Sequence, residues 1–325
     1  MRATLLMLAL ALALALALAA ALPAAGAAEG AAFRDVLDTP ARESALAAHT
    51  PLAALARAGN ALVAAGSRGH VLRSEDGGAS WHQASVPVSS DLVALSFPDA
   101  HSGWAAGHDG VILHSSDGGR SWHHQFDGRM LGPQGAENPL LDIWFANAEE
   151  GWAVGAFGLL LHTSDGGQHW LSEEGLSDNP KKLHLYGVRG IGGRVYVVGE
   201  QGLLLRLSEK GRYEALSQPY AGTLFGISGD GDTLLIHGLR GHALRSSDAG
   251  RSWEPLETGL QVGLTASSRT PDGRWLLASQ AGHVLVSRDG AHSFAPLLRT
   301  QPVSALLAGP QGLVTAGPRG VLVQP

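Results

Sequence analysis

The 325-residue sequence contains no cysteine. Disulfide bonds, thiolate metal ligands and cysteine nucleophiles are therefore excluded, and core packing and strand pairing have to hold the fold together. An excess of basic residues is missing as well, because the formal net charge is −6 at pH 7. Binding to nucleic acid without sequence preference needs a basic surface that displaces counterions. We therefore expect no nucleic-acid partner.

Only one long apolar run occurs, and it lies at the N-terminus. Residues 5–22 are Leu, Ala and one Met, with Arg2 before them and Pro23 and small residues after them. This order is typical of an export signal, so we predict a signal peptide at residues 1–28 and a periplasmic or otherwise exported chain. The run is also long enough to stay as an uncleaved membrane anchor. Without a second run, residues 29–325 are expected to be a soluble monomer that associates with membranes only peripherally.

A short turn motif recurs five times. It reads SEDGGASW, SSDGGRSW, TSDGGQHW, SSDAGRSW and SRDGAHSF. Its Asp can accept N–H groups of its own turn, its glycines allow positive φ, and the final aromatic residue can fill the space between neighbouring sheets. A catalytic acid is not needed five times at equivalent positions, so we interpret the motif as structural. Its key residues are Asp76, Trp81, Asp117, Trp122, Asp165, Trp170, Asp248, Trp253, Asp289 and Phe294.

A longer repeat surrounds each turn. Short alternating stretches are separated by Gly, Asp and Asn turns, which indicates strands. A second hairpin, mostly bounded by glycines, occurs in all seven copies at a period of roughly 40 to 50 residues, which is typical of four-stranded propeller blades. The fourth copy keeps its strands and lacks the Asp turn. We predict one all-β domain at residues 29–325, a seven-bladed β-propeller.

The seventh copy is incomplete. Residues 302–325 supply three strands, and no Asp turn or fourth strand follows. The stretch AFRDVLD at residues 32–38 has strand character and belongs to no other copy. We therefore predict that it forms the outer strand of blade seven, which would close the ring and protect a sheet edge.

The turn motif resembles the Asp-box, or BNR repeat, of sialidase-like propellers. The stretches GWAAGHDGVILHSSDGGRSW and GWAVGAFGLLLHTSDGGQHW, at residues 103–122 and 151–170, are similar to the repeats of the photosystem II stability/assembly factor family. The resemblance covers residues 33–325 and implies an exported, noncatalytic assembly chaperone. It also implies a membrane protein or an envelope complex as the partner, and an arginine patch that contacts it.

Contact residues are expected in the second hairpins. These hairpins and the connections between blades share one face of a propeller, while the Asp turns lie on the other. Guanidinium groups on a rigid rim suit a carboxylate or an acidic segment, although arginines are also common in exposed turns. The candidates at the hairpin centres are Arg68, Asp109, Phe157, Gln201, Arg240 and Arg319.

The longest connection between blades spans residues 123–139 and should project over the same face. In it, Phe126 and Arg129 offer an aromatic group and a cation, with Met130 beside them, for contact with a protein partner. Residues 173–184 form the next candidate connection. The alternative for both is a mobile loop without a partner.

No cofactor or metal is expected. The fifteen histidines are spread over equivalent repeat positions, and no helical pair has zinc-ligand spacing. The enzyme alternative is an Asp-box glycoside hydrolase, which needs two carboxylates across a cleft. The Arg-Ile-Pro motif of sialidases is missing, and the copy number is seven rather than six. A third alternative is an accessory protein of an envelope transporter or secretion complex, with the same fold and a different client.

Overall fold

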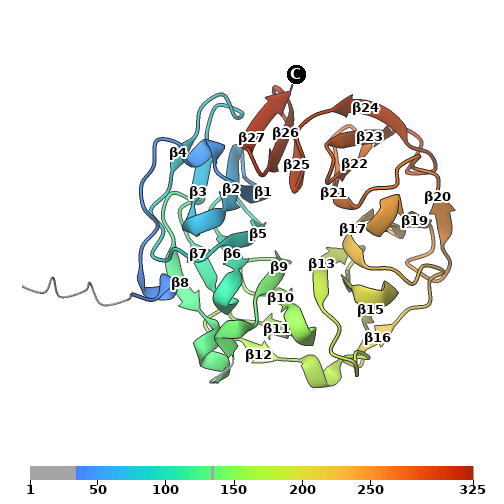
Figure 1. The fold of residues 1–325 in the computed structure, drawn as a ribbon. Helices are drawn as coiled ribbons and strands as arrows, with labels where there is room; N and C mark the ends of the chain where they lie inside the picture. Colours follow the sequence, from blue (N-terminus) through green and yellow to red (C-terminus); the bar gives the residue numbers. More distant parts are fainter. Residues whose placement is uncertain (1–33, 133–134, 325) are drawn as a thin grey trace, which may run out of the picture. The chain divides into compact units, whose positions relative to one another are not determined.

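Seven antiparallel sheets form a ring in this chain (Figure 1). The structure is a computed structural model that describes residues 34–132 and 135–324. The chain divides into two units, Met1–Asp35 and Val36–Pro325, and all seven sheets belong to the second unit. The ring confirms the seven-bladed β-propeller that the repeats predicted.

Blades one to six are four-stranded meanders, and blade seven has three strands. Blades one to three contain β1 (Leu52–Ala58), β2 (Ala61–Gly66), β3 (Val71–Ser74), β4 (His82–Gln83), β5 (Leu92–Ser96), β6 (Gly103–Gly107), β7 (Ile112–Ser115), β8 (His123–Phe126), β9 (Leu140–Phe145), β10 (Gly151–Gly155), β11 (Leu160–Thr163) and β12 (Leu171–Ser172). Blades four to seven contain β13 (Leu185–Ile191), β14 (Arg194–Gly199), β15 (Leu204–Leu207), β16 (Tyr213–Ala215), β17 (Leu224–Asp230), β18 (Thr233–Gly238), β19 (Ala243–Ser246), β20 (Glu254–Leu256), β21 (Leu264–Arg269), β22 (Trp275–Ser279), β23 (His283–Ser287), β24 (Ala295–Arg299), β25 (Ala305–Gly309), β26 (Gly312–Gly317) and β27 (Gly320–Gln324).

Helical structure in the described ranges is limited to short 3₁₀ turns. They are η1 (Val36–Asp38), η2 (Ala47–His49), η3 (Ser67–Gly69), η4 (His108–Gly110), η5 (Gly128–Leu131), η6 (Gly135–Glu137), η7 (Ala156–Gly158), η8 (Glu174–Leu176), η9 (Glu200–Gly202) and η10 (Leu239–Gly241). None of these described helices is long and apolar enough to cross a membrane. The predicted signal peptide, residues 1–28, lies outside the described residues.

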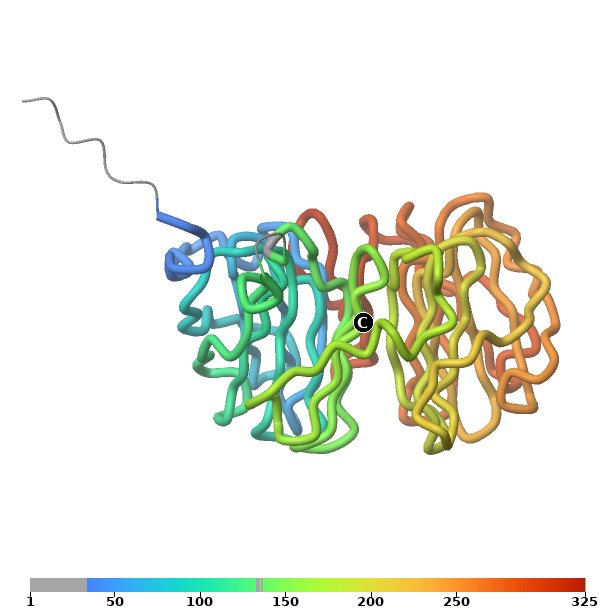
Figure 2. The backbone as a smooth tube through the Cα atoms, turned by 90° about the horizontal axis from the view of Figure 1, so that it is seen from below, coloured from blue at the N-terminus to red at the C-terminus, as the bar shows by residue number. Residues whose placement is uncertain are grey.

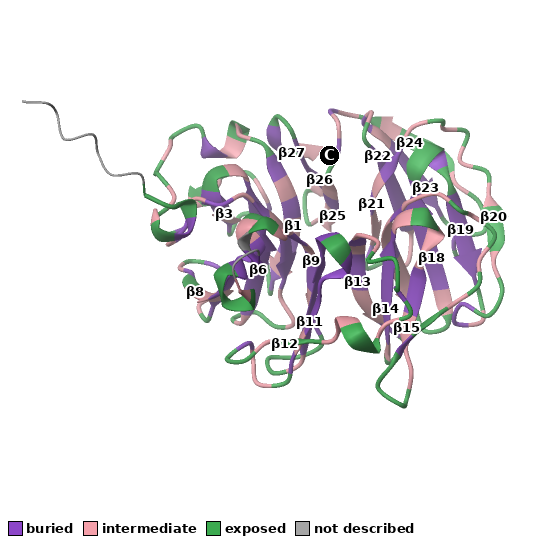
Figure 3. Cartoon of the chain, turned by 60° about the horizontal axis from the view of Figure 1, so that its bottom comes forward, coloured by how far each residue is buried: buried purple, intermediate pink, exposed green. Residues whose placement is uncertain are grey.

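The core lies between blades. The strands run between the two faces of the ring (Figure 2), and buried residues follow the strands while the loops at both faces are exposed (Figure 3). Between blades two and three, Trp104 stacks on Phe145 with ring centroids 3.6 Å apart, and Ile112 and Leu140 pack beside them. Fully burying one such side chain contributes about 2 kcal/mol. Each blade is therefore stabilised mainly by its two neighbours.

The Asp turns close on their own carboxylates. In the first turn, Ser80 donates to Asp76 from its backbone N–H at 2.9 Å and from its hydroxyl at 2.6 Å. In the third turn, His169 takes the place of this serine, and the Thr163 hydroxyl also donates to Asp165 at 2.9 Å. Backbone and side-chain hydrogen bonds from His169 lower the pKa of Asp165 to about 2. The carboxylate is thus a charged acceptor at neutral pH and holds the turn in one conformation.

A side chain of the preceding blade also bonds to each of the five Asp turns. The acceptor is always a backbone carbonyl of the turn, and one such bond is worth about 1 kcal/mol net. The pairs are Gln311 to Asp76 (2.8 Å), Arg73 to Gly118 (2.9 Å), Gln125 to Gly166 (2.8 Å), Tyr196 to Ala249 (3.2 Å) and Arg245 to Gly290 (3.0 Å). Together with the shared cores, these bonds fix five of the seven pairs of neighbouring blades.

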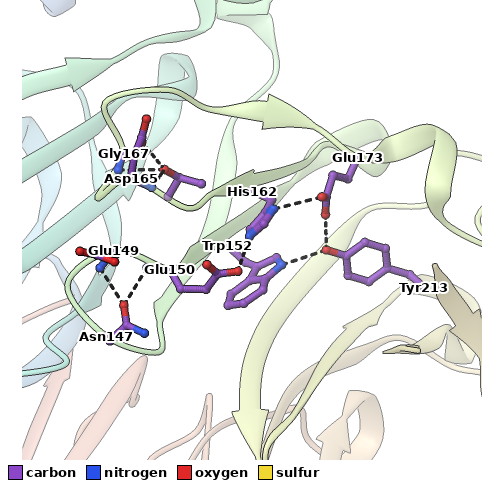
Figure 4. Close-up of polar contacts among 10 residues, drawn as sticks. Asn147, Glu149, Glu150, Trp152, His162, Asp165, Gly167, Glu173 and Tyr213 are labelled. Atoms are coloured by element: carbon purple, nitrogen blue, oxygen red, sulfur yellow. Dashed lines mark hydrogen bonds and ion pairs between the residues drawn. The ribbon is translucent and has the colours of Figure 1, made fainter. Parts of the chain in front are cut away.

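Blade four lacks the Asp turn, and a different network joins it to blade three (Figure 4). Trp152 donates from Nε1 to the Tyr213 hydroxyl at 2.9 Å, and this hydroxyl donates to Glu173. The His162 ring lies between two carboxylates, with Nδ1 3.0 Å from Glu173 and Nε2 2.7 Å from Glu150. Ionised carboxylates only accept, so this position between two carboxylates favours the doubly protonated ring. The hydrogen bonds to Glu173 and then Glu150 raise the pKa of His162.

The described residues of the predicted outer strand, 34–38, do not pair with blade seven. Residues 32 and 33 of the predicted strand lie outside the described residues, and Val36–Asp38 form η1 instead of a strand. Leu37 is buried in the core between blades one and two. The Val36 carbonyl accepts the N–H of Ser89. The prediction was wrong because a single buried side chain in a turn, here Leu37, gives the same alternation of apolar and polar residues as a short strand.

Residues 36–50 instead form a strap along the outside of blade one, seen as the blue segment at the left edge of the ring in Figure 1. The N–H of Ala41 donates to Val86, and that of Ser44 donates to the side chain of Gln83, both at 3.0 Å. At its end, η2 lies against β27, with Ala47 buried in the core shared by blades seven and one. Side-chain packing therefore covers the three-stranded blade at this point.

The His162 network predicts a pH-dependent stability. The pKa of His162 is raised in the folded chain, so its contribution is complete below the ordinary pKa of about 6.5 and is lost as pH rises through the folded value. We expect H162Q to lower the free energy of unfolding by about 1–2 kcal/mol at acidic pH, and by less above neutrality. Urea unfolding over this pH range measures the difference. H292Q, at an exposed histidine of another blade, is the control; parallel pH profiles for wild type and H162Q would contradict the prediction.

Candidate functional site

The second hairpins of blades one to five have the same backbone turn. In each, a non-glycine residue at the tip has positive φ and is followed by a glycine with positive φ. The carbonyl before the tip accepts the N–H after the glycine, as Ser67 does from His70 at 3.2 Å. Two successive residues of positive φ are typical of a type I′ turn. The tips are Arg68 (φ 59°), Asp109 (φ 60°), Phe157 (φ 56°), Gln201 (φ 53°) and Arg240 (φ 55°).

These tips are the residues that the sequence analysis selected in the same blades. A side chain in this conformation costs about 1–2 kcal/mol relative to glycine. Asp109 is half-buried, and the other four tips are exposed. Blade seven differs, since Arg319 is exposed but only the following Gly320 has positive φ. The turn thus fixes the position of each tip residue on the rim, while the chemistry of the tip side chain varies from blade to blade.

In blades one to six, a hydrogen bond ties the hairpin to the connection that leads into its blade. The first N–H of the hairpin donates to the carbonyl of the residue just before the inner strand. The pairs are Ser67 to Pro51, His108 to Asp91, Ala156 to Pro139, Glu200 to His184, Leu239 to Thr223 and Gln280 to Gly263, at 2.9–3.0 Å. Hairpins and connections therefore lie together on one face, which we call the hairpin face.

Three arginines of the hairpin face are available for contact. Arg68, Arg240 and Arg319 are exposed, and their guanidinium groups form no ion pair or hydrogen bond within the part of the chain that the structure describes. Blades seven and one are neighbours in the ring, because β1 packs beside β25 and β26. Arg319 and Arg68 thus lie on adjacent blades, and Arg240 lies on blade five.

β-Bulges at the hairpin end of the inner strands form the mouth of the central channel. In blades one to six, the register between the first two strands slips by one residue, which leaves one inner-strand residue unpaired. Bulges of this kind re-aim a side chain and are common next to functional sites. The unpaired residues all line the channel, and we call them the mouth ring: Ala53, Val93, Leu141, Tyr186, Phe225 and Thr265.

The channel behind the mouth ring encloses about 690 Å³ and is lined by residues from all seven inner strands. Asp142 is its one lining carboxylate among the described residues, and burial raises the pKa of this group. It accepts from the Arg189 guanidinium and from the N–H of Val188 at 2.8 Å. Burial lowers the pKa of His237 to about 4, and its neutral ring bonds to the carbonyl of Leu264 at 2.9 Å. These groups link neighbouring blades.

The connection of residues 123–139 contributes less to the surface than expected. Phe126 belongs to β8 and is buried in the core between blades two and three. Its assignment as a contact residue is therefore corrected, because β8 takes up the first four residues of the predicted loop. Arg129 is exposed, and its guanidinium bonds to Asp127 at 2.7 Å and to Asp38 of the strap at 3.0 Å. It holds the loop and the strap together.

No metal centre is evident in the described part of the chain. There, no cluster of three or more His, Asp or Glu side chains has the arrangement of a metal site. In the His162 network, the ring nitrogens and the carboxylates of Glu150 and Glu173 are paired with one another (Figure 4). The donors of this group are thus occupied within the protein.

The fold and the hairpin face define a closed Asp-box propeller with variable side chains on a fixed rim around an open channel. The chain matches the family model of the photosynthesis system II assembly factor YCF48 over residues 56–133 and 133–302. It therefore belongs to the YCF48 family, as the repeats predicted. A comparison with curated proteins found no match.

Solved structures show the same architecture. YCF48 bound to a D1 peptide is 19% identical, with a TM-score of 0.66 over 90% of this chain and 99% of that chain. YCF48 from Cyanidioschyzon merolae is 16% identical, with a TM-score of 0.67 over 87% of this chain and 97% of that one. A GH74 xyloglucanase from Xanthomonas campestris is 14% identical, with a TM-score of 0.64 over 86% and 52%. At these identities the likeness shows the propeller fold alone.

The strained tips predict an unusual response to glycine. Q201G should raise the free energy of unfolding by up to about 1 kcal/mol, because glycine adopts positive φ without the steric cost. The matched change at blade six, A281G, should lower it by about 0.5–1 kcal/mol, since the tip there does not have positive φ. Urea unfolding of both variants measures the contrast. Equal destabilisation by the two glycines would show that the Gln201 turn stores no strain.

Proposed function

We propose that this chain is an exported, noncatalytic assembly factor that binds a segment of a membrane protein or an envelope complex through its hairpin face. One observation carries the proposal. Arg68, Arg240 and Arg319 are exposed on that face without a carboxylate partner in the described part of the chain. Exposed guanidinium groups without an internal partner are free to pair with the carboxylates of a bound acidic segment.

The chemistry of arginine suits an acidic peptide. A guanidinium group is planar, remains charged, and can bond to both oxygens of a carboxylate. The hairpins are anchored to the connections by hydrogen bonds, so their backbones lose little freedom when a partner binds, which favours affinity. Asp109 and Gln201, at two other tips, add an acceptor and an amide on the same rim. The rim thus offers several polar contacts at fixed positions.

The family supports a polypeptide of a membrane complex as the client. A relative of the same fold, YCF48, has been solved with a D1 peptide. A peptide segment is therefore the partner that we propose for this chain. A transporter or a secretion complex of the envelope would use the same surface and would differ only in the client.

Two observations support a noncatalytic role. Asp142 is the one carboxylate that lines the channel in the described residues, and Arg189 pairs with it, whereas glycoside hydrolysis needs two carboxylates. Tyr213 lies beside Glu173, a pairing that a sialidase-type nucleophile would need. Burial, and then the hydrogen bond to Glu173, raise the pKa of Tyr213 far above its ordinary value. Its phenol is neutral and buried, so it is no nucleophile.

The export signal expected at residues 1–28 supports a location outside the cytoplasm, where the chain would reach the exposed segments of membrane proteins. The proposed protein acts as a monomer, needs no cofactor and approaches the membrane through its client. A dense hydrogen-bonded frame without disulfides suits this compartment as well as any other, so the location rests on the signal alone.

Charge reversal of the rim tests the proposal. Cells expressing the tagged full-length protein are crosslinked, and the recovered partners are identified by mass spectrometry. We expect the variant R68E/R240E/R319E to recover the client about tenfold less than wild type, because repulsion replaces charge-assisted hydrogen bonds.

The control for this experiment is K210E/R251E/R288E, which reverses three exposed charges in the turns of the opposite face. It should recover the client as wild type does. Unchanged recovery by the rim variant would overturn the arginine contact, and turnover of a fluorogenic sialoside or of xyloglucan by the purified protein would overturn the noncatalytic role.

A further inference from the structure

The mouth ring changes character around the channel. Ala53, Val93 and Leu141 make its side at blades one to three aliphatic, Thr265 makes it polar at blade six, and between these sectors it is aromatic. Tyr186 and Phe225 occupy the bulges of blades four and five, and both line the channel. A bulge leaves its side chain without a cross-strand partner, so the residue type is not dictated by the sheet. The two aromatic residues therefore call for another explanation.

The two rings continue outward to the rim as a row of aromatic contacts. Phe225 meets Tyr186 edge to face, with centroids 5.6 Å apart and planes at 86°. The Tyr186 ring lies 6.4 Å from that of His184, and His184 meets Phe157 at 4.8 Å and 63°. These four residues, which we call the aromatic row, come from the β10–β11 hairpin, the start of blade four and the inner strand of blade five. The row runs from the outermost tip of blade three into the channel mouth.

Phe157 is unfavourable for the free protein in two ways. Its side chain is 53% exposed, although it is a large hydrophobic residue. Its backbone also has a φ of 56°, which is strained for a bulky side chain. The equivalent tips, Arg68, Asp109, Gln201 and Arg240, are polar. An exposed aromatic residue in a strained conformation, at the rim of a channel, is the kind of feature that a binding site retains.

The aromatic row and two of the arginines lie on different sides of one opening. The row belongs to blades three, four and five, whereas Arg319 and Arg68 belong to blades seven and one. Blade four lies across the seven-membered ring from the contact of blades seven and one. One extended segment lying over the mouth would therefore meet the cations at one end and the aromatic row at the other.

We infer that the aromatic row binds an aromatic or large aliphatic side chain of the same polypeptide segment whose carboxylate contacts the arginines. This inference rests on the proposed function and adds a sequence preference for the bound segment. The segment should contain an acidic residue and, several positions before or after it, a large apolar residue. Burying an aromatic side chain against other rings contributes through its apolar area and through edge-to-face contact. The arginines alone would accept any acidic segment.

The geometry favours a polypeptide over a sugar. Stacking on a sugar needs a flat aromatic face, whereas two of the three ring contacts of the row are edge to face, at 63° and 86°. The middle pair, His184 and Tyr186, is tilted at 35°, so the row offers ring edges as well as faces to an apolar side chain. The mouth behind the row is aliphatic on one flank and polar on the other. A peptide lying there would have apolar contacts on one side and polar groups on the other for its backbone N–H and C=O groups.

A peptide array tests the preference. The probes are immobilised peptides of about twelve residues, which reach about 40 Å when extended. Each has a Gly-Ser background, one Glu and, at increasing distance from it, one Phe, Leu or Ser. The purified full-length protein is applied to them and, in a separate arm, to xyloglucan oligosaccharides. We expect Glu–Phe peptides to bind about tenfold more tightly than Glu–Ser peptides at the preferred spacing.

Three variants assign the preference to the row. F157A should bind Glu–Phe and Glu–Ser peptides equally, as should F225T, which places the threonine of blade six in blade five. The control L171A removes another exposed apolar side chain of blade three, 66% exposed on its outer strand, and should keep the preference. R68E/R240E/R319E should weaken binding to every Glu peptide.

The outcomes separate the two proposals. If wild type binds Glu–Phe and Glu–Ser peptides equally, or if F157A and F225T keep the preference, the aromatic row is overturned while the proposed function stands. If wild type binds none of the peptides, both are overturned. Binding of the oligosaccharides in place of the peptides would also overturn both, and would assign the mouth to a carbohydrate.

Discussion

The structure depends on the burial of both faces of every blade. Each sheet has apolar side chains on its two sides, so it is stable only between two neighbours, and a row of blades is stable only if it closes. Trp104 and Phe145 illustrate this constraint, since each belongs to a different blade and neither is buried without the other. The bonds from five of the blades to the next Asp turn then set the orientation, and the end of the strap packs at the junction of blades seven and one.

The Asp turns and the second hairpins lie on opposite faces of the ring. On one face, the Asp turns use nearly the same residues each time, because each must hold its own carboxylate and bond to the preceding blade. On the hairpin face, the backbone repeats and the side chains vary. In blades one to five, positive φ at the tip, glycine after it and a bulge in the inner strand together place two variable side chains per blade. The chemistry of the rim can therefore change without a change in the frame.

The repeats predicted most of the fold, since seven glycine-bounded hairpins define seven blades and the tips lie at the residues chosen from the sequence. Phe126 was predicted in a loop because the end of a strand leaves no clear mark in a short alternating stretch. Residues 34–38 were predicted as a strand because a single buried side chain in a turn gives the same alternation. The mouth ring left a signal that was overlooked. Core residues such as Leu185 and Val188, or Leu224 and Ile227, are three apart instead of two, which is the mark of an inserted bulge residue. The aromatic contacts join residues of three blades, and no local pattern reveals them.

Closure between blades seven and one has a consequence for how the protein is made. Gln311 bonds to Asp76 across 235 positions, and Arg57 bonds to Ala308 across 251. Contacts this distant in the chain form late and slow the folding of a domain. Until the last strands arrive, blade one has an uncovered apolar face, with Leu62 and Ala64 open to water or to other chains. The chain thus passes through a stage in which this apolar face can aggregate, and closure of blade seven on blade one ends that stage.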